Sequence, residues 1–317
     1  MRIPLALPPP AARPFDVVGF GLNSVDLFAV VAEFPTNSSK QRLQRFARLP
    51  GGPTATTLVG CTRLGWRTRY IGSFGGDEHG RLVRRALAEA GVDLAGCRVV
   101  ANAANQFAVI LVDGSSGERT VLWDRDPALE LDPADLPQDL LTSGRTLLVD
   151  GHEAVASARA AALARAAGIP TVIDIERVRP GTLDLLRDID VVIAAEEFPG
   201  ELTGLDGAGA ALQALYAEFR PAVACVTLGR EGSLAICQGH EIRTPAFHLP
   251  CVDTTGAGDA FRAGFLAAWL AEPDADLDRV LLAANAVAGL NCRRLGAWDA
   301  LPRPDELAAL LSRAGGM

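Results

Sequence analysis

Short apolar runs alternate with amphipathic segments along the second half of the chain. Runs at residues 146–150, 170–175, 191–194 and 222–227 have the length and composition of buried strands. Helical spacing of apolar residues fills 154–167, 181–187 and 208–219 between them. Strands and helices that alternate at such short intervals predict a parallel sheet with helices on both faces. The fold class is therefore expected to be α/β, and residues 15–21 predict one more buried strand of that sheet.

The first half of the chain interrupts this rhythm. Residues 40–49 are polar with spaced apolar positions, which suits an exposed strand, and β-rich runs at 107–112 and 118–123 predict a hairpin. We expect these strands to form a small β appendage over the carboxyl edge of the sheet, where open α/β sheets bind ligands. A second hairpin is expected at 233–245, and further helices at 54–64, 80–90, 259–271, 277–290 and from about 303.

The amino-terminal segment differs from the rest. Residues 1–14 contain Pro8, Pro9 and Pro10 and predict a disordered or polyproline II leader. Its apolar run at 3–7 is too short for a signal peptide, and nowhere does an apolar stretch reach the length of a membrane span.

Charge and composition exclude several function classes. The net charge of −8 and the pI near 5.1 argue against a nucleic-acid surface. Lys40 is the only lysine, so a Walker A loop, a protein-kinase strand lysine and a pyridoxal Schiff base are all missing. The six cysteines form no CxxC pair and are expected to be buried thiols in a reducing cytoplasm.

The segment at 253–261, Asp-Thr-Thr-Gly-Ala-Gly-Asp-Ala-Phe, carries the clearest chemistry. It joins a turn of small residues, a carboxylate and the start of an apolar helix. Backbone N–H groups of such a turn can hold a phosphoryl group, and Asp259 can take a proton from an alcohol. Asp259 could equally serve as the N-cap of the following helix, and the two roles are compatible.

Other motifs are ambiguous when each is taken alone. Gly51 and Gly52 precede a helix and mark either a tight turn or a place where a substrate approaches the backbone. Asp26 follows the first strand and is either a turn cap or a ligand for substrate hydroxyls. The run Thr227-Leu-Gly-Arg-Glu-Gly232 suits nucleotide phosphates or a structural turn. Gly19-Phe-Gly-Leu-Asn-Ser24 lacks the third glycine of a dinucleotide fingerprint.

Taken together, these motifs resemble the ribokinase (PfkB) family of carbohydrate kinases. The segment 253–261 resembles the family's C-terminal signature, and Gly51-Gly-Pro-Thr-Ala-Thr56 with Arg63-Leu-Gly65 resembles its N-terminal signature. Residues 72–80, 227–232 and 284–286 agree in order, so the likeness covers about 15–310. It implies a three-layer α/β/α domain at 15–317 with a mainly parallel central sheet. The small β lid would consist of strands at about 35–50 and 105–125.

The resemblance also implies an activity and roles for particular residues. It implies ATP-dependent phosphorylation of a hydroxymethyl group of a small sugar, with Mg²⁺ and, in some members, K⁺. Asp259 would be the catalytic base, and the N–H groups of Gly256, Ala257 and Gly258 would form the anion hole. The lid would also provide contacts for a homodimer. By the same likeness, the sugar would be contacted by Asp26, Gly51, Gly52, Thr56 and His152. The lid side chains of Asp124 and Arg125 would either contact the sugar and set specificity or be solvated strand positions. The nucleotide site would be lined by Thr227, Gly229, Gly232 and Asn285, and a monovalent cation held at Asp253 and Thr255.

Three departures from the family pattern bear on specificity and metal binding. Thr56 replaces the usual asparagine of the first signature, and His152 stands where many relatives place an acidic sugar contact. The Asn-x-x-Glu motif linked to Mg²⁺ has lost its form, which leaves Glu196 and Glu197 as candidates. These changes look closer to ketohexokinase-like and uncharacterised sugar kinases than to ribokinase proper.

Two alternative functions stay open at the level of sequence. One is a nucleoside kinase on the same fold. The other is a catalytically weak sugar or nucleotide sensor, which the altered metal motif would favour and the intact Gly-Ala-Gly-Asp turn opposes.

Overall fold

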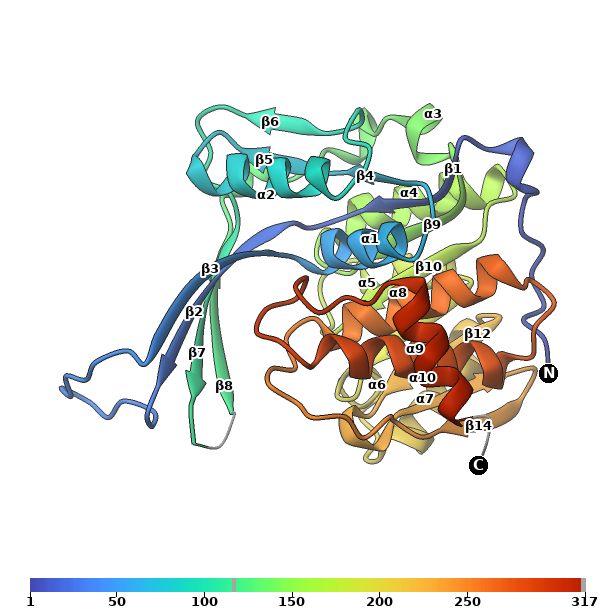
Figure 1. The fold of residues 1–317 in the computed structure, drawn as a ribbon. Helices are drawn as coiled ribbons and strands as arrows, with labels where there is room; N and C mark the ends of the chain where they lie inside the picture. Colours follow the sequence, from blue (N-terminus) through green and yellow to red (C-terminus); the bar gives the residue numbers. More distant parts are fainter. Residues whose placement is uncertain (116–117, 315–317) are drawn as a thin grey trace.

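A computed structural model describes residues 1–115 and 118–314, and an eight-stranded sheet forms its centre (Figure 1). The strand order is β14-β13-β12-β11-β10-β9-β1-β4. The strands from β12 to β4 are parallel, while β13 and β14 pair antiparallel at one edge. Their bounds are β1 Phe15–Phe20, β4 Thr68–Ile71, β9 Gly144–Asp150, β10 Thr171–Ile175, β11 Val191–Ala195, β12 Val223–Thr227, β13 Ser233–Cys237 and β14 His240–Thr244.

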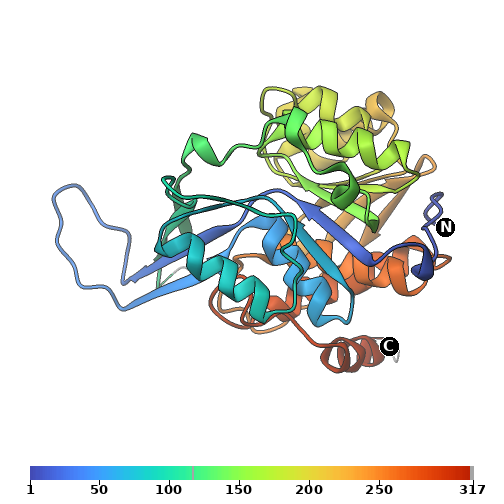
Figure 2. The same ribbon diagram turned by 90° about the horizontal axis from the view of Figure 1, so that it is seen from above.

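Helices cover both faces of this sheet, as the view from above shows (Figure 2). Successive residues of a strand belong to different hydrophobic cores because strand side chains alternate between faces. Val17 packs in the core shared with α1 (Pro53–Arg63), α8 (Ala257–Ala271) and α9 (Leu277–Asn291). Val18 packs in the core shared with α4 (Ala154–Ala166), α5 (Thr182–Arg187) and α7 (Ala208–Phe219). The predicted three-layer α/β/α fold class is thereby confirmed.

The remaining elements are short or peripheral. Strands β5 (Ser73–Gly75) and β6 (Arg98–Val100) form a two-stranded sheet beside α2. The other helices are α2 Glu78–Glu89, α3 Gln138–Leu141, α6 Phe198–Thr203 and α10 Pro304–Ala314. No helix in the described part of the chain is long and apolar enough to cross a membrane.

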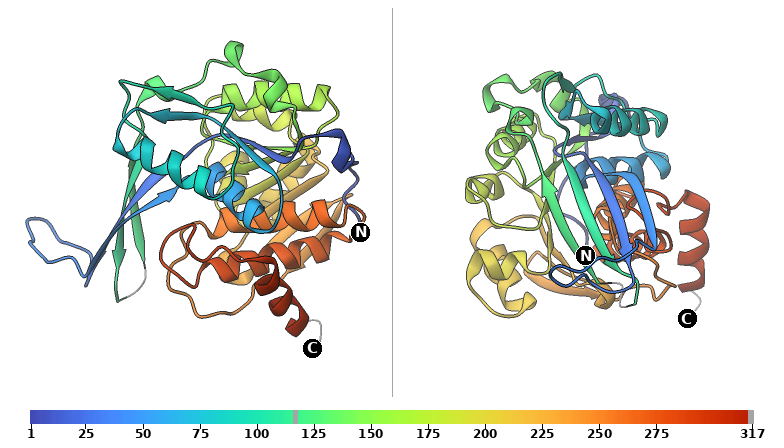
Figure 3. Two further views of the ribbon diagram at one scale, coloured as in Figure 1. Left: turned by 45° about the horizontal axis from the view of Figure 1, so that its top comes forward. Right: turned by 90° about the vertical axis from the view of Figure 1, so that its left-hand side faces the viewer.

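A separate four-stranded sheet projects from the body, and we call it the lid (Figure 3, right). Its order is β3-β2-β7-β8, with bounds β2 Ser24–Val31, β3 Arg45–Gly51, β7 Phe107–Asp113 and β8 Arg119–Asp124. The predicted hairpin is present as β7 and β8. The strand expected at 40–49 begins only at Arg45, and β2, the central strand next to it, was not foreseen.

The inner face of the lid, which we define by Asp26, is the face turned toward the body. Phe28, Ala108 and Ile110 alternate onto this face and pack with Leu295 from the loop after α9. The outer face carries the intervening residues of each strand. This alternation decides below which lid side chains can reach a bound substrate.

The amino-terminal segment is packed on the body, which does not fit the disordered alternative of the predicted leader, whereas Pro9, with φ of −62° and ψ of 151°, has polyproline II geometry. Ile3 is buried, and Met1, Leu5 and Leu7 pack against the same core. Backbone contacts fix the start of the chain, since the Leu277 N–H donates to the Met1 carbonyl at 2.7 Å. The overlooked signal is the period of two in the apolar residues at 1, 3, 5 and 7, which gives an extended segment one apolar side.

Candidate active site

Candidate residues from distant parts of the sequence meet at the carboxyl edge of the central sheet. His152 follows β9, Glu176 follows β10, Glu196 follows β11, and Thr227 ends β12. Since these strands are parallel, their carboxyl ends lie along one edge, which is the usual ligand edge of an open α/β sheet. Helix α8 joins them there, because Arg262 of this helix pairs with Asp174 of β10 and with Asp259.

The turn at residues 253–258 is held by the Asp253 carboxylate. Its Oδ1 accepts hydrogen bonds from the Thr255 N–H at 3.0 Å and the Thr255 hydroxyl at 2.8 Å, and Oδ2 accepts from the Gly296 N–H at 2.8 Å. Gly256 is the N-cap of α8 with φ of +74°, and a Cβ there would lie 2.7 Å from the Cβ of Ala297. The backbone at Gly256 is therefore possible only for glycine.

Two of the three predicted anion-hole donors are available. The Ala257 N–H is not, because it donates to the Thr254 carbonyl at 3.1 Å within the turn. The N–H groups of Gly256 and Gly258 have no hydrogen-bond acceptor among the described residues. They stand at the positive end of α8, where helix N-termini bind anions.

Asp259 lies in the first turn of α8, as its third residue, so the helix begins two residues earlier than expected and Asp259 is not its N-cap. Its side chain is 15% exposed. The pKa of Asp259 is raised to about 7, mainly by burial, which the charge of Arg262 opposes and the nearby Glu176 carboxylate reinforces. A carboxylate with a pKa near 7 is matched to act as a base at neutral pH.

A buried ion pair between Arg262 and Asp174, which the sequence did not reveal, lies next to Asp259. The Arg262 guanidinium is 2% exposed, lies 3.5 Å from Oδ1 of Asp259, pairs with the Asp174 carboxylate and donates to the Ile193 carbonyl at 3.2 Å. Burial raises the pKa of Asp174 well above its usual range, although Arg262 opposes the shift. The available signal was a single charged residue inside the otherwise apolar run 260–270.

Asp26 forms the opposite side of the site. It is buried on β2, accepts a hydrogen bond from the Ser24 hydroxyl at 2.9 Å, and its pKa is raised by burial to about 6. A Cβ at Gly51 would lie 2.2 Å from Oδ2 of Asp26. A Cβ at Gly52, where φ is +96°, would lie 2.5 Å from the Cα of Asn23. Both glycines are thus required by packing against β2, and their contact with a substrate stays a prediction.

Three residues predicted to contact the sugar are placed elsewhere by the structure. Thr56 is completely buried, and its hydroxyl accepts a hydrogen bond from the Trp298 indole at 2.8 Å. Asp124 pairs with Phe107, so strand alternation places it on the outer face of the lid, opposite Asp26. Arg125 forms an ion pair with Glu153 in which both side chains are nearly buried, so its charge is already compensated.

His152 does reach the site. It lines a small cavity of about 20 Å³ together with Pro53, Asp174 and Glu176. Its Nδ1 lies 3.7 Å from Oδ1 of Asp150, and burial lowers the pKa of His152 despite this carboxylate. The imidazole is therefore neutral at pH 7 and can donate to or accept from a hydroxyl group.

The candidate nucleotide loop lies at the end of β12. Gly229 and Gly232 have φ of +53° and +98°, and a Cβ at Gly232 would lie 2.1 Å from the Thr244 carbonyl oxygen. A cavity of about 180 Å³ beside this loop is lined by Leu228, Glu231, Ser233, Arg243, Thr244 and Pro245. The Asn285 amide is buried and donates to the Ser233 hydroxyl at 3.0 Å. Asn285 therefore anchors the β13–β14 hairpin to α9, and a nucleotide contact from it stays a prediction.

The candidate metal ligands fit a metal held mainly through water and phosphate. Glu196 and Glu197 are exposed after β11, and no group of three or more metal-ligating side chains occurs in residues 1–115 and 118–314. Mg²⁺ in kinases typically keeps several waters and binds phosphates plus one or two carboxylates. The Asp253 carboxylate already accepts three hydrogen bonds, and the K⁺ site predicted with Thr255 stays a prediction.

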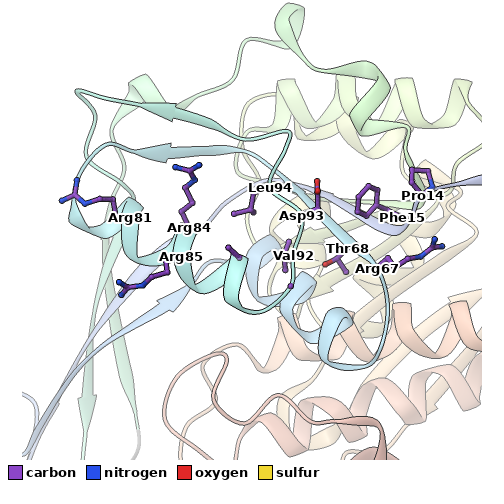
Figure 4. Close-up of a pocket in the computed structure, with 12 residues that line it drawn as sticks. Pro14, Phe15, Arg67, Thr68, Arg81, Arg84, Arg85, Val92, Asp93 and Leu94 are labelled. Carbon is purple, nitrogen blue, oxygen red and sulfur yellow. The ribbon is translucent and has the colours of Figure 1, made fainter.

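A larger hollow of about 860 Å³ lies away from these residues (Figure 4). It is lined by Phe15 and Thr68, which begin β1 and β4, and by arginines of α2 whose side chains point in different directions. It therefore opens at the amino edge of the sheet. The size of this hollow does not make it the active site.

Comparison with known proteins identifies the family of this chain. Residues 15–304 match the model of the pfkB family of carbohydrate kinases. A fructokinase of Klebsiella pneumoniae is 34% identical over 284 residues, which cover 83% of this chain and 92% of the relative. An ATP-dependent ribose-1-phosphate kinase of Halopiger xanaduensis is 30% identical over 301 residues, covering 93% and 98%.

Solved structures share the fold at lower sequence identity. Arabidopsis thaliana ribokinase complexed with ribose and ATP superposes with a TM-score of 0.80 at 24% identity, covering 94% of this chain and 98% of that one. A fructokinase with bound ATP from Xylella fastidiosa also gives 0.80, at 22% identity, covering 94% and 99%.

Proposed function

The chain belongs to the pfkB family of carbohydrate kinases, and from this we propose that it transfers the γ-phosphoryl group of ATP to a hydroxymethyl group of a small sugar or sugar-like substrate. The observation that carries the proposal is the carboxylate of Asp259, with a pKa near 7, beside the two available amides of Gly256 and Gly258. Phosphoryl transfer needs little more than positioning and charge stabilisation, and this arrangement offers both.

In the proposed reaction, the residues of the site act one after another. Asp26 and His152 bind the sugar and orient its hydroxyl toward Asp259. Asp259 accepts the hydroxyl proton as the oxygen attacks the γ-phosphorus, while the bond from that phosphorus to the β–γ bridging oxygen breaks and ADP leaves. The Gly256 and Gly258 amides donate to the phosphoryl oxygens. Mg²⁺, when bound with the nucleotide, neutralises phosphate charge, and Glu196 or Glu197 would hold its water shell.

The test is turnover of the intact chain and of one variant. We expect the wild type to release ADP in the presence of Mg²⁺ and one member of a panel of ketoses, aldoses and sugar acids. Asp259→Asn should lower kcat by roughly 10²–10⁴-fold, since a positioned base typically contributes that much, and leave the Kd for ATP nearly unchanged. Wild-type kcat in Asp259→Asn on the true substrate would refute the assignment of the base.

A nucleoside kinase is the second candidate, and one observation favours it. Trp123 lies on the inner face of β8 and is 55% exposed, which offers an aromatic surface on which a nucleobase could stack. Including nucleosides in the same panel separates the two candidates. Phosphorylation of a nucleoside but of no free sugar would favour this second function.

We also propose that the chain forms a homodimer through the outer face of the lid. Phe46 and Leu122 on this face are 61% and 63% exposed. They belong to neighbouring rows that cross the sheet. One row holds Phe46, Ala29, Leu111 and Thr120, and the other holds Arg48, Leu27, Val109 and Leu122, of which Leu27 also packs against the main core. An apolar sheet face of this kind commonly marks a protein interface.

A further inference from the structure

Strand β8 is an edge strand of the lid. Arg119, Val121 and Trp123 pair with Val112, Ile110 and Ala108 and therefore lie on the inner face. The first and the last of these three residues of β8 both contact the body. The Arg119 guanidinium donates a hydrogen bond to the Thr254 hydroxyl, and the Arg179 guanidinium lies 5.9 Å from the centre of the Trp123 ring.

The contact of Arg119 is with the turn that leads to the two available amides. Thr254 is two residues before Gly256. Burial is the main cause that raises the pKa of Cys292 to about 12, and the charge of Arg119 opposes this rise. The Cys292 carbonyl accepts hydrogen bonds from the N–H groups of Val252 and Asp253 at the start of the same turn. The hydrogen bond to Thr254 therefore places the positive charge of Arg119 at this turn, and its effect on Cys292 follows from the same placement.

The other guanidinium that contacts the turn cannot take the same role. In the described part of the chain, hydrogen bonds and ion pairs to residues 253–259 come from only two arginines, Arg119 and Arg262. Arg262 is 2% exposed and is already bonded to Asp174 and to the Ile193 carbonyl. Arg119 is exposed, and one of its five N–H donors is seen in a hydrogen bond, to a neutral hydroxyl. It has donors left for an anion.

We propose that Arg119 contacts the transferring γ-phosphoryl group and is a catalytic residue, an inference that rests on the proposed kinase function. As the sugar oxygen bonds to the γ-phosphorus and the bond to the leaving ADP oxygen breaks, negative charge spreads over three equatorial oxygens. The amides of Gly256 and Gly258 approach these oxygens from the body, and Arg119 approaches from the lid. A guanidinium placed this way stabilises the transition state of phosphoryl transfer.

The location on the lid has a mechanistic consequence. The guanidinium of Arg119 reaches the turn only when β8 lies over the site. In the same position the lid encloses the sugar. Transfer to water is then disfavoured, because the cation arrives together with the acceptor and the exclusion of solvent.

The experiment compares Arg119→Ala and Arg119→Lys with Arg45→Ala. Arg45 is a matched control because it lies in the same row of the inner face, on the opposite edge strand: Arg45 pairs with Val30, Val30 with Val112, and Val112 with Arg119. The measurements are kcat at saturating substrates, the Kd for ATP without acceptor, and the Kd for ADP with aluminium fluoride and acceptor. A fourth measurement is the kcat of each variant with millimolar guanidinium chloride added, well below denaturing concentrations.

We expect Arg119→Ala to lower kcat by about 10²–10³-fold and to weaken the aluminium fluoride complex, with the Kd for ATP changed less than about threefold. Arg119→Lys should retain more activity, and guanidinium should restore part of kcat to Arg119→Ala. Arg45→Ala should behave as the wild type. Near-wild-type kcat in Arg119→Ala, an equal loss in Arg45→Ala, or a loss that guanidinium does not relieve would overturn the role of Arg119. Absence of ADP release from the wild type would instead refute the kinase function itself.

Discussion

Single residues set the chemistry of this site, and Asp259 illustrates how strongly burial can tune one carboxylate. Its pKa of about 7 contrasts with the usual aspartate value of 3.8. Two neighbours on different elements, Glu176 and Arg262, act on it in opposite directions. The sequence identified Asp259, whereas its environment is a property of the fold.

This pKa predicts the pH dependence of turnover. A general base must be unprotonated, so kcat should rise with pH through an apparent pKa near 7 and level off above it. The apparent value belongs to the coupled carboxylates, since Asp174 and Asp259 interact. A pH–rate profile at saturating ATP checks this expectation, and an acid limb near pH 4 would contradict it.

The same shift predicts a cost in stability. The folded-state pKa of Asp259 lies above its unfolded value, so its contribution keeps the free energy of unfolding highest below about pH 4, and that free energy falls as pH rises toward about 7, where the folded-state group also ionises. Asp259→Asn has no charge to bury and should be more stable than the wild type by about 1–2 kcal/mol at pH 8. Urea unfolding at pH 8 and pH 4 measures the difference, which should disappear at the lower pH.

At the scale of elements, Arg262 ties helix α8 to strands β10 and β11. Arg262→Met should lower the free energy of unfolding by about 3–5 kcal/mol, because it leaves Asp174 buried without its partner. The double variant Arg262→Met with Asp174→Leu should regain most of that loss. Urea unfolding of the two variants measures these free energies. If the free energy of unfolding of Arg262→Met were within about 1 kcal/mol of the wild-type value, the ion pair would contribute little to stability.

Elements were predicted well where a local pattern governs them and poorly where a distant partner does. Strands such as 146–150 and helices such as 154–167 matched because apolar periodicity reflects burial in a layered fold. Strand β2 was missed although residues 27–31 are all apolar, because so short an apolar run does not by itself distinguish a strand from other buried segments. Its pairing with β3 and β7 gives it strand geometry.

The residues of the candidate site also differ in how far the sequence alone shows their arrangement. Asp259, Gly256 and Gly258 lie in one continuous turn, so their arrangement followed from neighbouring residues in the sequence. The sequence did not show the surroundings of Thr56 and Asp124, because these depend on distant parts of the chain, on Trp298 in one case and on strand register in the other.

At the scale of the whole molecule, the outer face of the lid predicts the oligomeric state. Leu122→Asp would place a charge in the middle of the proposed dimer interface and should convert the dimer to a monomer. Sedimentation velocity or light scattering at micromolar concentration measures the change. Val155→Asp, at an exposed apolar residue of α4 on the body, is the matched control and should leave the dimer intact. A wild-type chain that is monomeric at these concentrations would refute the proposal.

The exposed indole on the inner side of β8 gives this molecule an intrinsic optical probe. Trp269 is fully buried, Trp298 is 5% exposed and Trp66 is partly buried against the core, while Trp123 is 55% exposed. When an acceptor enters and the strand settles over it, the emission of Trp123 should shift while that of the other three tryptophans stays constant. Candidate substrates can therefore be ranked by fluorescence titration without added dye and before any turnover is measured.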